Sequence, residues 1–389
     1  MGIRRETGTY RASTVGGERV KAYIPLALPP KPPVELAPLF PLLDRANQAL
    51  GRLDGSMELL PDQKLFIYLY LRKEAVLSSQ IEGTPSSLSD LLQFESGLSV
   101  DGPMDDLSET SNYVAAMEHG LERLKGGFPI SLRLLCEIHG VLLRKGRGAQ
   151  RTPGEFRRSQ NWIGGTRPGN ALFVPPPPDA LMECLDAFEK YLYDDQLPLL
   201  VKLGLVHVQF ETIHPFLDGN GRLGRLLLTL LLCESRVLRE PLLYLSLYLK
   251  TNRNRYYELL QQVRTAGAWE EWLQFFLEGI ESTARQAADT AIQLRQLFRE
   301  DSLRIQTEAK SAATCLQVHN YLQARPVASI RSIAKGISRT ITTVSGVLTN
   351  MQQLGIVNEI TGQRRNRVFV YQSCLDLIGA GTEPIPKAT

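Results

Sequence analysis

The chain has 389 residues, of which 43% are hydrophobic and 22% are charged, which is the composition of a folded, multidomain protein rather than a disordered one. Its formal net charge of +3 is too small to indicate binding to nucleic acid or to anionic membranes. The richest apolar run, Leu223–Cys233, is too short to span a bilayer, and the five scattered cysteines include no CxxC pair. These features predict a cytoplasmic protein without a membrane-spanning segment.

The N-terminal part is expected to pass from an extended arm into a series of helices. Residues 1–36 are rich in Gly, Pro and Thr, and the LPPKPPV segment at 28–34 disfavours a helix. Beyond it, apolar residues recur at spacings of three and four, which is typical of amphipathic helices. The predicted helices are 37–51, 61–81, 112–124, 131–143, 179–193, 199–212, 222–234, 241–248, 254–264 and 269–309, with a further one after Ser86–Ser89.

One segment departs from this helical pattern. Residues 161–178 (NWIGGTRPGNALFVPPPP) have apolar residues on both sides of a Pro-Gly-Asn turn and end in four prolines. A turn of this type between alternating residues favours antiparallel pairing, and proline ends a strand. We therefore expect an exposed β-hairpin here.

The C-terminal part has a different character. We expect helices at 315–323, 329–335 and 339–354, followed by strands at 355–359 and 367–371. Eight basic residues and two acidic ones lie between Lys310 and Asp376, so the positive charge is local. Three helices followed by a basic hairpin indicate a winged helix-turn-helix domain over 311–376. A helical linker over 281–310 precedes it, and a tail over 377–389 follows it.

The twelve residues 214–225 (HPFLDGNGRLGR) carry the groups that phosphate chemistry requires. A Gly-Asn-Gly turn leading into a helix gathers backbone N–H groups around an anion. Arg222 and Arg225 share one helix face and can bind phosphates bidentately. The Asp218 carboxylate suits Mg²⁺ held between phosphates, and His214 can accept a proton from a hydroxyl near neutral pH. Together these residues predict a site for nucleotidyl or phosphoryl transfer.

This stretch resembles the signature of the Fic family, HPFx[D/E]GNGRxxR, and matches it at every defined position. The surrounding helices and the hairpin extend the resemblance to about residues 37–300. The resemblance implies a mainly α protein with a Fic-type helical core over 111–280 and a β-hairpin flap. It also implies an N-terminal helical segment over 37–110, and a C-terminal winged helix is common in one branch of the family.

The resemblance further implies a protein adenylyltransferase, which transfers AMP from ATP to Ser, Thr or Tyr hydroxyls of proteins, including itself, with Mg²⁺ as cofactor. In that family role, His214 is the general base and Asp218 is the metal ligand. Gly221 matters for the reaction type, because family members that phosphorylate have Lys at this position. The implied ATP-binding residues are Glu82, Gly219, Asn220, Gly221, Arg222 (β-phosphate), Leu223, Gly224, Arg225 (γ-phosphate), Asn252 and Tyr256 (adenosine).

Two other segments receive roles from the resemblance. The hairpin corresponds to the flap that binds target proteins by β-augmentation. Its expected contact residues are Gly164, Gly165, Phe173 and Val174. The Ser78–Gly83 segment (SSQIEG) fits the inhibitory pattern [S/T]xxxE[G/N], in which Ser78, Glu82 and Gly83 mark the end of an inhibitory helix. The hypothesis is that Glu82 pairs with Arg225 and denies it to the γ-phosphate.

The sequence leaves two other functions open. One is a DNA-binding transcriptional regulator whose Fic domain senses a nucleotide, since Arg364, Arg365 and Arg367 suit DNA phosphates. Against it, residues 340–354 contain no Lys or Arg for base readout. The other is a hydrolase that removes AMP from proteins, with Glu82 orienting a water molecule. The winged helix could instead bind protein, and the resemblance leaves a homodimer open.

Overall fold

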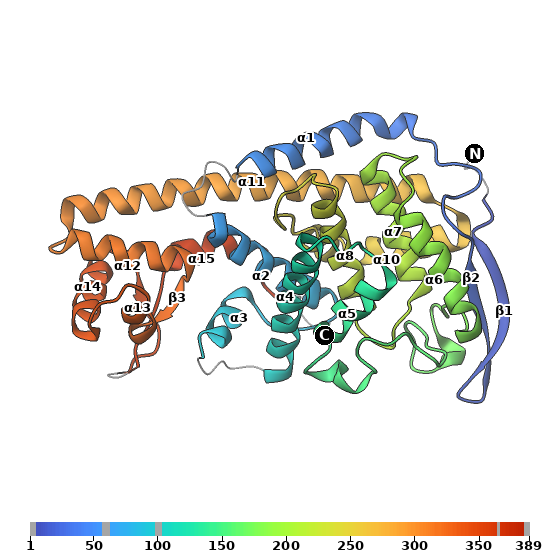
Figure 1. The fold of residues 1–389 in the computed structure, drawn as a ribbon, viewed down its shortest axis with the longest axis horizontal. Coiled ribbons are helices and arrows are strands. Elements are labelled where there is room, and N and C mark those ends of the chain that lie inside the picture. Colours follow the sequence, from blue (N-terminus) through green and yellow to red (C-terminus); the bar gives the residue numbers. More distant parts are fainter. Residues whose placement is uncertain (1–4, 57–62, 98–102, 364–365, 385–389) are drawn as a thin grey trace. The chain divides into compact units, whose positions relative to one another are not determined.

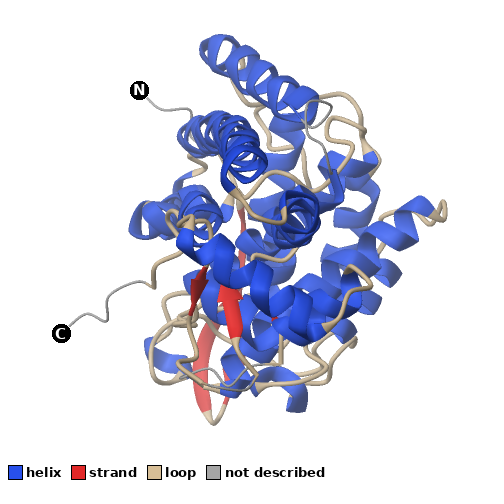
Figure 2. Ribbon diagram, turned by 90° about the vertical axis from the view of Figure 1, so that its left-hand side faces the viewer, coloured by secondary structure: helices blue, strands red, loops and turns tan. Residues whose placement is uncertain are grey.

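The computed structural model describes residues 5–56, 63–97, 103–363 and 366–384 (Figure 1). These residues are mainly helical, and their strands form two small antiparallel sheets (Figure 2). The chain divides into two compact units, of which the first comprises residues 1–50, 112–239 and 248–283. The second unit comprises residues 51–111, 240–247 and 284–389. Among the described helices, none has both the length and the apolar character needed to cross a bilayer.

The first unit begins with an antiparallel hairpin of β1 (Gly8–Val15) and β2 (Glu18–Pro25). Gly16 and Gly17 join the strands, with φ of +57° and +83°. Glycine adopts such angles without strain, and the tight two-residue turn matches the twist of the paired strands. The N-terminal arm is therefore extended as we expect, but it also pairs with itself. The Gly-Gly dipeptide between two extended runs is the sequence signal for this turn.

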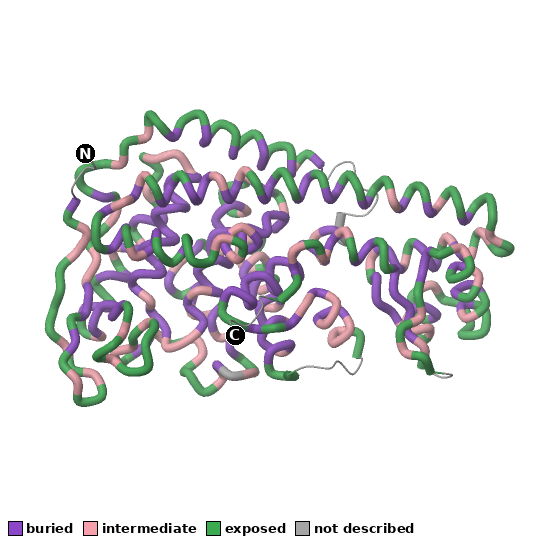
Figure 3. The backbone as a smooth tube through the Cα atoms, turned by 180° about the vertical axis from the view of Figure 1, so that it is seen from behind, coloured by how far each residue is buried: buried purple, intermediate pink, exposed green. Residues whose placement is uncertain are grey.

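The remaining elements of the first unit are helices. Those that lie wholly or partly in it are η1 (Ala37–Leu39), α1 (Phe40–Ser56), α4 (Met104–Lys125), α5 (Leu132–Leu142), η3 (Arg147–Gln150), η4 (Pro168–Asn170), α6 (Pro178–Leu192), α7 (Leu199–Ile213), α8 (Asn220–Glu234), α9 (Ser246–Thr251), α10 (Arg253–Ala266) and α11 (Trp269–Glu308). At the centre, α7 is buried on every side, because it is apolar nearly all round, and it packs against α6, α8 and α10. Buried and exposed positions recur along α11, as in a helix with one apolar face (Figure 3).

The second unit combines helices with a three-stranded sheet. Its further elements are α2 (Gln63–Ile81), α3 (Leu88–Glu95), α12 (Ala312–Ala324), β3 (Val327–Ser329), α13 (Ile330–Gly336), α14 (Ile341–Gln353), β4 (Asn358–Glu359), β5 (Val368–Val370) and α15 (Gln372–Gly379). The strands are antiparallel in the order β3-β5-β4, and α2 packs against α3, α12 and α15. The three predicted C-terminal helices are confirmed, whereas β3 and α15 are additional to the prediction. The predicted contacts of Arg364 and Arg365 lie outside the described residues.

One helix prediction is wrong at its start. We expect a helix over 241–248, but α9 begins only at Ser246. The Glu74 carboxylate accepts hydrogen bonds from both the backbone N–H and the hydroxyl of Ser246. The buried Glu74 side chain thus satisfies backbone and side-chain donors at the first residue of α9. Residues 241–244, which precede this start, are not helical.

The predicted hairpin over 161–178 is also wrong in detail. Instead of two strands, a single antiparallel bridge joins Ile163 to Phe173, and the turn contains η4. The Asn170 side-chain oxygen accepts from the backbone N–H groups of Thr166 and Arg167, at 3.0 and 2.9 Å. These bonds close a compact turn in place of a longer ladder. The four prolines that follow have no N–H group to continue a ladder.

Candidate functional site

The Fic-like motif of residues 214–225 begins where α7 ends. His214 is the C-cap residue of α7, with φ +49° and ψ +62°, and its N–H donates to the Phe210 carbonyl at 2.9 Å. A left-handed conformation is uncommon for a residue with a side chain and costs about 1–2 kcal/mol. The half-buried imidazole therefore follows a sharp turn of the backbone, which the surrounding contacts must hold.

The loop between α7 and α8 is held by side-chain amides. Asn220 Oδ1 accepts from the N–H of Phe216, and Asn220 Nδ2 donates to its carbonyl, both at 2.9 Å. Asn161, at the start of the flap, donates to the same carbonyl at 3.0 Å. The side chain of the asparagine in the Gly-Asn-Gly turn is thus buried and engaged with the loop.

His139 of α5 packs against the loop between α7 and α8, and the sequence analysis does not predict this role. Its ring stacks on Phe216 at 3.8 Å between centroids. Nδ1 accepts from the Gly154 N–H at 2.9 Å, so Nε2 carries the proton and donates to the Asp218 carbonyl at 3.0 Å. Burial lowers the pKa of His139 to about 4, so the ring is neutral at pH 7.

The start of α8 gathers positive charge. Its N-cap is Gly219, with φ +75°, which has no side chain to bond the first-turn N–H groups. Arg222 and Arg225 lie one turn apart on this helix and are only 5% and 3% exposed. Two buried guanidinium groups near a helix N-terminus attract an anion strongly, because the helix dipole adds to their positive charge.

Asp218 supplies the carboxylate of the site. Its side chain is 41% exposed, and Oδ1 lies 3.4 Å from Arg222 Nη2. The same oxygen accepts from the Gly219 N–H at 2.6 Å. Among the described residues, no group of three or more His, Cys, Asp or Glu side chains gathers. One exposed carboxylate fits Mg²⁺, which commonly takes its other ligands from phosphates and water.

Three of the predicted ATP-binding residues lie in the core. Leu223 is buried, and a Cβ at Gly224 would lie 2.8 Å from Glu211 Oε1, so this face of α8 packs on α7. Tyr256 is also buried, and its hydroxyl pairs with His207 Nε2 at 2.9 Å. The structure thus places these three residues in the core, and their ATP-binding roles stay predictions from the sequence. Asn252 remains half-buried at the N-cap of α10 and donates to the Tyr248 carbonyl at 3.0 Å.

The predicted inhibitory motif lies at the end of α2, in the second unit. Ser78 is fully buried, Glu82 is exposed just after the helix, and Gly83 has φ +95°. A positive φ at this position explains why glycine ends the helix. Gln80, between them, donates to the carbonyls of Ser86 and Thr382 at 2.8 and 2.7 Å.

The flap is partly covered by the N-terminal hairpin. Phe173 and Val174 are buried rather than exposed, and the Tyr23 N–H of β2 donates to the Val174 carbonyl at 2.9 Å. Val174 also packs in a small cluster with Val20 and Ala22. The prediction that the whole hairpin is exposed is therefore wrong for its second half. Gly164 and Gly165 in its first half are exposed, with φ of +67° and +73°.

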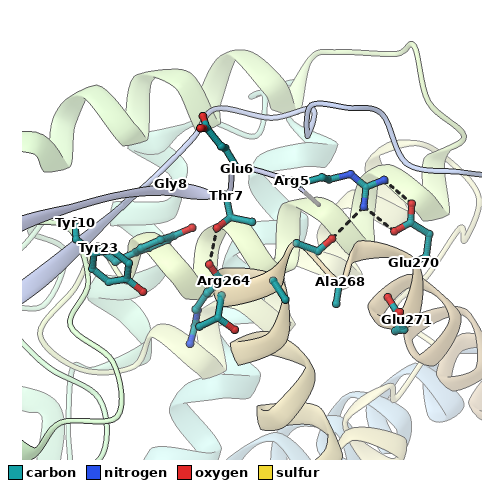
Figure 4. Close-up of a pocket in the computed structure, with 13 residues that line it drawn as sticks. Arg5, Glu6, Thr7, Gly8, Tyr10, Tyr23, Arg264, Ala268, Glu270 and Glu271 are labelled. Atoms are coloured by element: carbon teal, nitrogen blue, oxygen red, sulfur yellow. Dashed lines mark hydrogen bonds and ion pairs between the residues drawn. The ribbon is translucent and has the colours of Figure 1, made fainter. Parts of the chain in front are cut away.

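A hollow of about 660 Å³ lies beside the N-terminal hairpin in the first unit (Figure 4). Thr7 donates from its hydroxyl to the Arg264 carbonyl at 2.5 Å, and Arg5 forms a two-pronged ion pair with Glu270. The Arg264 guanidinium is buried, which lowers its pKa to about 10, and it lies 4.0 Å from the centroid of the Phe173 ring. This hollow therefore adjoins the base of the flap.

Comparison with known proteins agrees with the motif. Residues 40–122 match the Fic/DOC family N-terminal domain, and residues 129–232 match the Fic/DOC family. The protein adenylyltransferase Fic of Aedes aegypti is 32% identical over 251 residues, which are 63% of this chain and 46% of that protein. Its counterpart in Culex quinquefasciatus is 31% identical over 254 residues, with the same coverage of 63% and 46%. The chain thus spans about half the length of these curated relatives.

A solved structure extends the comparison to the fold. The crystal structure of a Fic family protein from Desulfovibrio desulfuricans G20 has a TM-score of 0.59 and 18% identity, and it covers 87% of this chain and 97% of that one. At this identity the likeness concerns the fold alone. With the complete motif, the two matches lead to one conclusion: residues 40–122 and 129–232 of this chain form a Fic/DOC family N-terminal domain and a Fic/DOC family domain.

Proposed function

We propose that this chain is a protein adenylyltransferase that transfers AMP from ATP to Ser, Thr or Tyr hydroxyls of proteins, including itself. The observation that carries the proposal is the motif loop. It places the half-buried His214 at the end of α7, and the buried Arg222 and Arg225 with the exposed Asp218 at the start of α8. The names of the relatives support the same reaction class.

The proposed reaction is an in-line displacement at the α-phosphorus. His214 accepts the proton of the target hydroxyl, and the hydroxyl oxygen forms a bond to the α-phosphorus of ATP. The bond from that phosphorus to the oxygen that bridges to the β-phosphate breaks, and pyrophosphate leaves with the electron pair. Arg222 would bind the β-phosphate and Arg225 the γ-phosphate, while the backbone N–H groups of residues 220 and 221 would face the α- and β-phosphates.

Asp218 would hold Mg²⁺ through its exposed carboxylate. When bound, the ion would neutralise charge on the phosphate oxygens and orient them. Family members that phosphorylate have Lys at the position of Gly221. The glycine in this chain therefore favours AMP as the transferred group.

The target is proposed to dock on the first half of the flap. Ile163 directs its backbone N–H and carbonyl inward to the Phe173 segment, at 2.8 to 3.1 Å. In an antiparallel pair, the neighbouring residues direct these groups to the opposite edge. Trp162 therefore offers the open edge for β-augmentation, whereas Gly164 (φ +67°) leaves the extended conformation and the Val174 carbonyl is already bonded to β2.

We further propose that Glu82 restrains the transferase. The support is the match of residues 78–83 to the inhibitory pattern and the position of Glu82, exposed directly after the end of α2. Pairing of Glu82 with Arg225 remains a prediction from the sequence. Replacing Glu82 with Gly is expected to raise the rate of AMP transfer.

A second candidate function, DNA binding, concerns the C-terminal module. The order of α12, α13 and α14 with the β3-β5-β4 sheet favours a winged helix, and the N-cap of α14 is made by the Thr340 hydroxyl. We propose DNA-phosphate contact by the basic wing around Arg367 as the alternative to adenylylation. A salt-sensitive gel shift that disappears on replacing Arg364, Arg365 and Arg367 supports this function, and no shift at low salt contradicts it.

The experiment that tests the main proposal uses two labelled nucleotides. The purified Glu82→Gly protein is incubated with Mg²⁺ and ATP labelled at either the α- or the γ-phosphate. Adenylylation predicts protein-bound label from the α-position only. Label from the γ-position would mean phosphorylation, and label from neither position would contradict transferase activity under these conditions.

A further inference from the structure

Arg157 joins the end of α7 to the flap. It lies in the loop that precedes the flap and is only 2% exposed. Its Nε donates to the His214 carbonyl at 2.9 Å, and its Nη2 donates to the carbonyls of Pro176 and Ile213, at 2.5 and 3.3 Å. The backbone N–H of Arg157 also donates to the Pro215 carbonyl at 3.0 Å. One side chain thus binds both the backbone of the candidate base and the return segment of the flap.

The surroundings of this guanidinium are unusual for a buried charge. Among the residues that the structure describes, it bonds backbone carbonyls and no carboxylate, with Ser159 as the remaining acceptor at 3.4 Å. Burial lowers its pKa to about 10, so it stays charged at pH 7. The carbonyl end of α7 carries the negative end of the helix dipole, which offsets part of the desolvation. A neutral apolar residue would fill this space without that penalty, so the charge points to a role beyond packing.

The role follows from the geometry of His214. The left-handed backbone of His214 is strained, and it persists only if its surroundings fix it. Arg157 donates hydrogen bonds to the His214 carbonyl and to the carbonyls of the two neighbouring residues, Ile213 and Pro215. The planar fork of the guanidinium, which a point charge lacks, lets one side chain satisfy acceptors on two segments at once.

We infer that Arg157 is a positioning residue, which holds the base His214 and the flap at a fixed distance from each other. This inference rests on the proposed adenylyltransferase function, because a target hydroxyl presented by the flap must reach the imidazole. Loss of the fork leaves ATP binding intact but misplaces the two reacting groups. A misplacement of about 1 Å can reduce a rate about 100-fold.

The test compares Arg157→Lys with Arg158→Lys, both in the Glu82→Gly background. Arg158 is the matched control, because it is the next residue, its side chain is 88% exposed, and it pairs with Glu155 in the same loop. The rate of self-adenylylation is followed by intact mass over a series of ATP concentrations. We expect the maximal rate of Arg157→Lys to fall about 10- to 100-fold, with the half-saturating ATP concentration changed by less than about twofold. Arg158→Lys should match its parent.

The fraction of folded protein separates positioning from stability. A purely structural role predicts fewer labelled molecules with an unchanged rate, whereas positioning predicts a slower rate in protein that thermal unfolding shows to be folded. An unchanged maximal rate in folded Arg157→Lys overturns the inference alone. If Arg157→Lys does not fold, Arg157→Gln takes its place, and failure of both variants to fold also overturns it. Absence of label in the Glu82→Gly parent overturns the proposed function instead, and this inference with it.

Discussion

Asn220 and Phe216 are joined by a pair of hydrogen bonds, each 2.9 Å long, between the amide side chain of Asn220 and both backbone groups of Phe216. The pair closes the loop that begins after His214 and ends at α8. The planar amide supplies an acceptor oxygen and a donor nitrogen as two separate atoms, which no hydroxyl, carboxylate or apolar side chain of similar size does. The asparagine of the motif therefore shapes the loop rather than binding a ligand through its amide.

Asn220→Asp tests this relationship. The aspartate keeps the acceptor but faces the Phe216 carbonyl with an oxygen instead of an N–H group. We expect a loss of about 1–3 kcal/mol in the free energy of unfolding, measured by urea denaturation. Asn254→Asp, at an exposed position of α10, is the control and should change this free energy by less than about 0.5 kcal/mol. Equal stability of the two variants would contradict the role of the pair.

Gly224 permits the close contact of α8 with α7. A Cβ there would lie 2.8 Å from Glu211 Oε1 and 3.1 Å from Phe210 Cδ1. Gly224→Ala is therefore expected to destabilise the protein by about 1–3 kcal/mol. Gly346→Ala, on the exposed face of α14, has no atom within 4 Å of the added Cβ and should stabilise the protein by about 0.4–1 kcal/mol. The same change in thermal midpoint for both variants would argue against the packing explanation.

His207 makes stability depend on pH. It is buried between α8, α10 and α11, and burial, together with the charge of Arg225, lowers its pKa to about 3. It also faces the Gly224 backbone, whose hydrogen bond acts to raise the pKa, the Tyr256 hydroxyl and the uncharged ring of Trp272. As the pH falls below about 6.5, the unfolded chain takes up a proton that the folded chain refuses, so stability is lost on acidification.

The measurement compares the wild type with His207→Gln by urea denaturation at pH 7 and pH 5. Between these values, wild type should lose about 2 kcal/mol more than the variant, because only the wild type carries the histidine. An equal loss in both proteins would mean that His207 is not the source.

Trp162 tests where targets dock. It lies on the proposed open edge of the flap and is an exposed aromatic residue. Trp162→Ala should raise the KM for a protein target about tenfold while leaving ATP binding, measured by calorimetry, unchanged. The control is Phe40→Ala, an exposed aromatic residue at the start of α1. A rise in the KM for the target in both variants, or in neither, would contradict docking along the first half of the flap.

The sequence reveals the parts of the site that are local. Residues 214–225 are consecutive, so their order alone predicts the turn and the helix that follow. His139 and Arg157 act on this loop from distant positions, and only the tertiary fold shows which carbonyls they meet. The burial of Tyr256 could not be predicted either, because helical spacing does not tell a core-facing aromatic residue from one that faces a ligand.

The fold shows the same division. Long amphipathic patterns such as that of α11 predict helices well, because each turn repeats the signal. The flap is predicted less well, because the pairing of Val174 with Tyr23 joins segments about 150 residues apart in sequence, and no local pattern encodes it. The burial of its second half is therefore a consequence of the N-terminal hairpin, which the composition of the arm does not reveal.

The most direct test of the central claim is the intact mass of the purified protein after incubation with ATP and Mg²⁺. Wild type, Glu82→Gly and His214→Ala are compared side by side. The account predicts an AMP-sized addition that is strong in Glu82→Gly, weak in wild type and absent in His214→Ala. A phosphate-sized addition, or an AMP-sized addition that persists without His214, would contradict it.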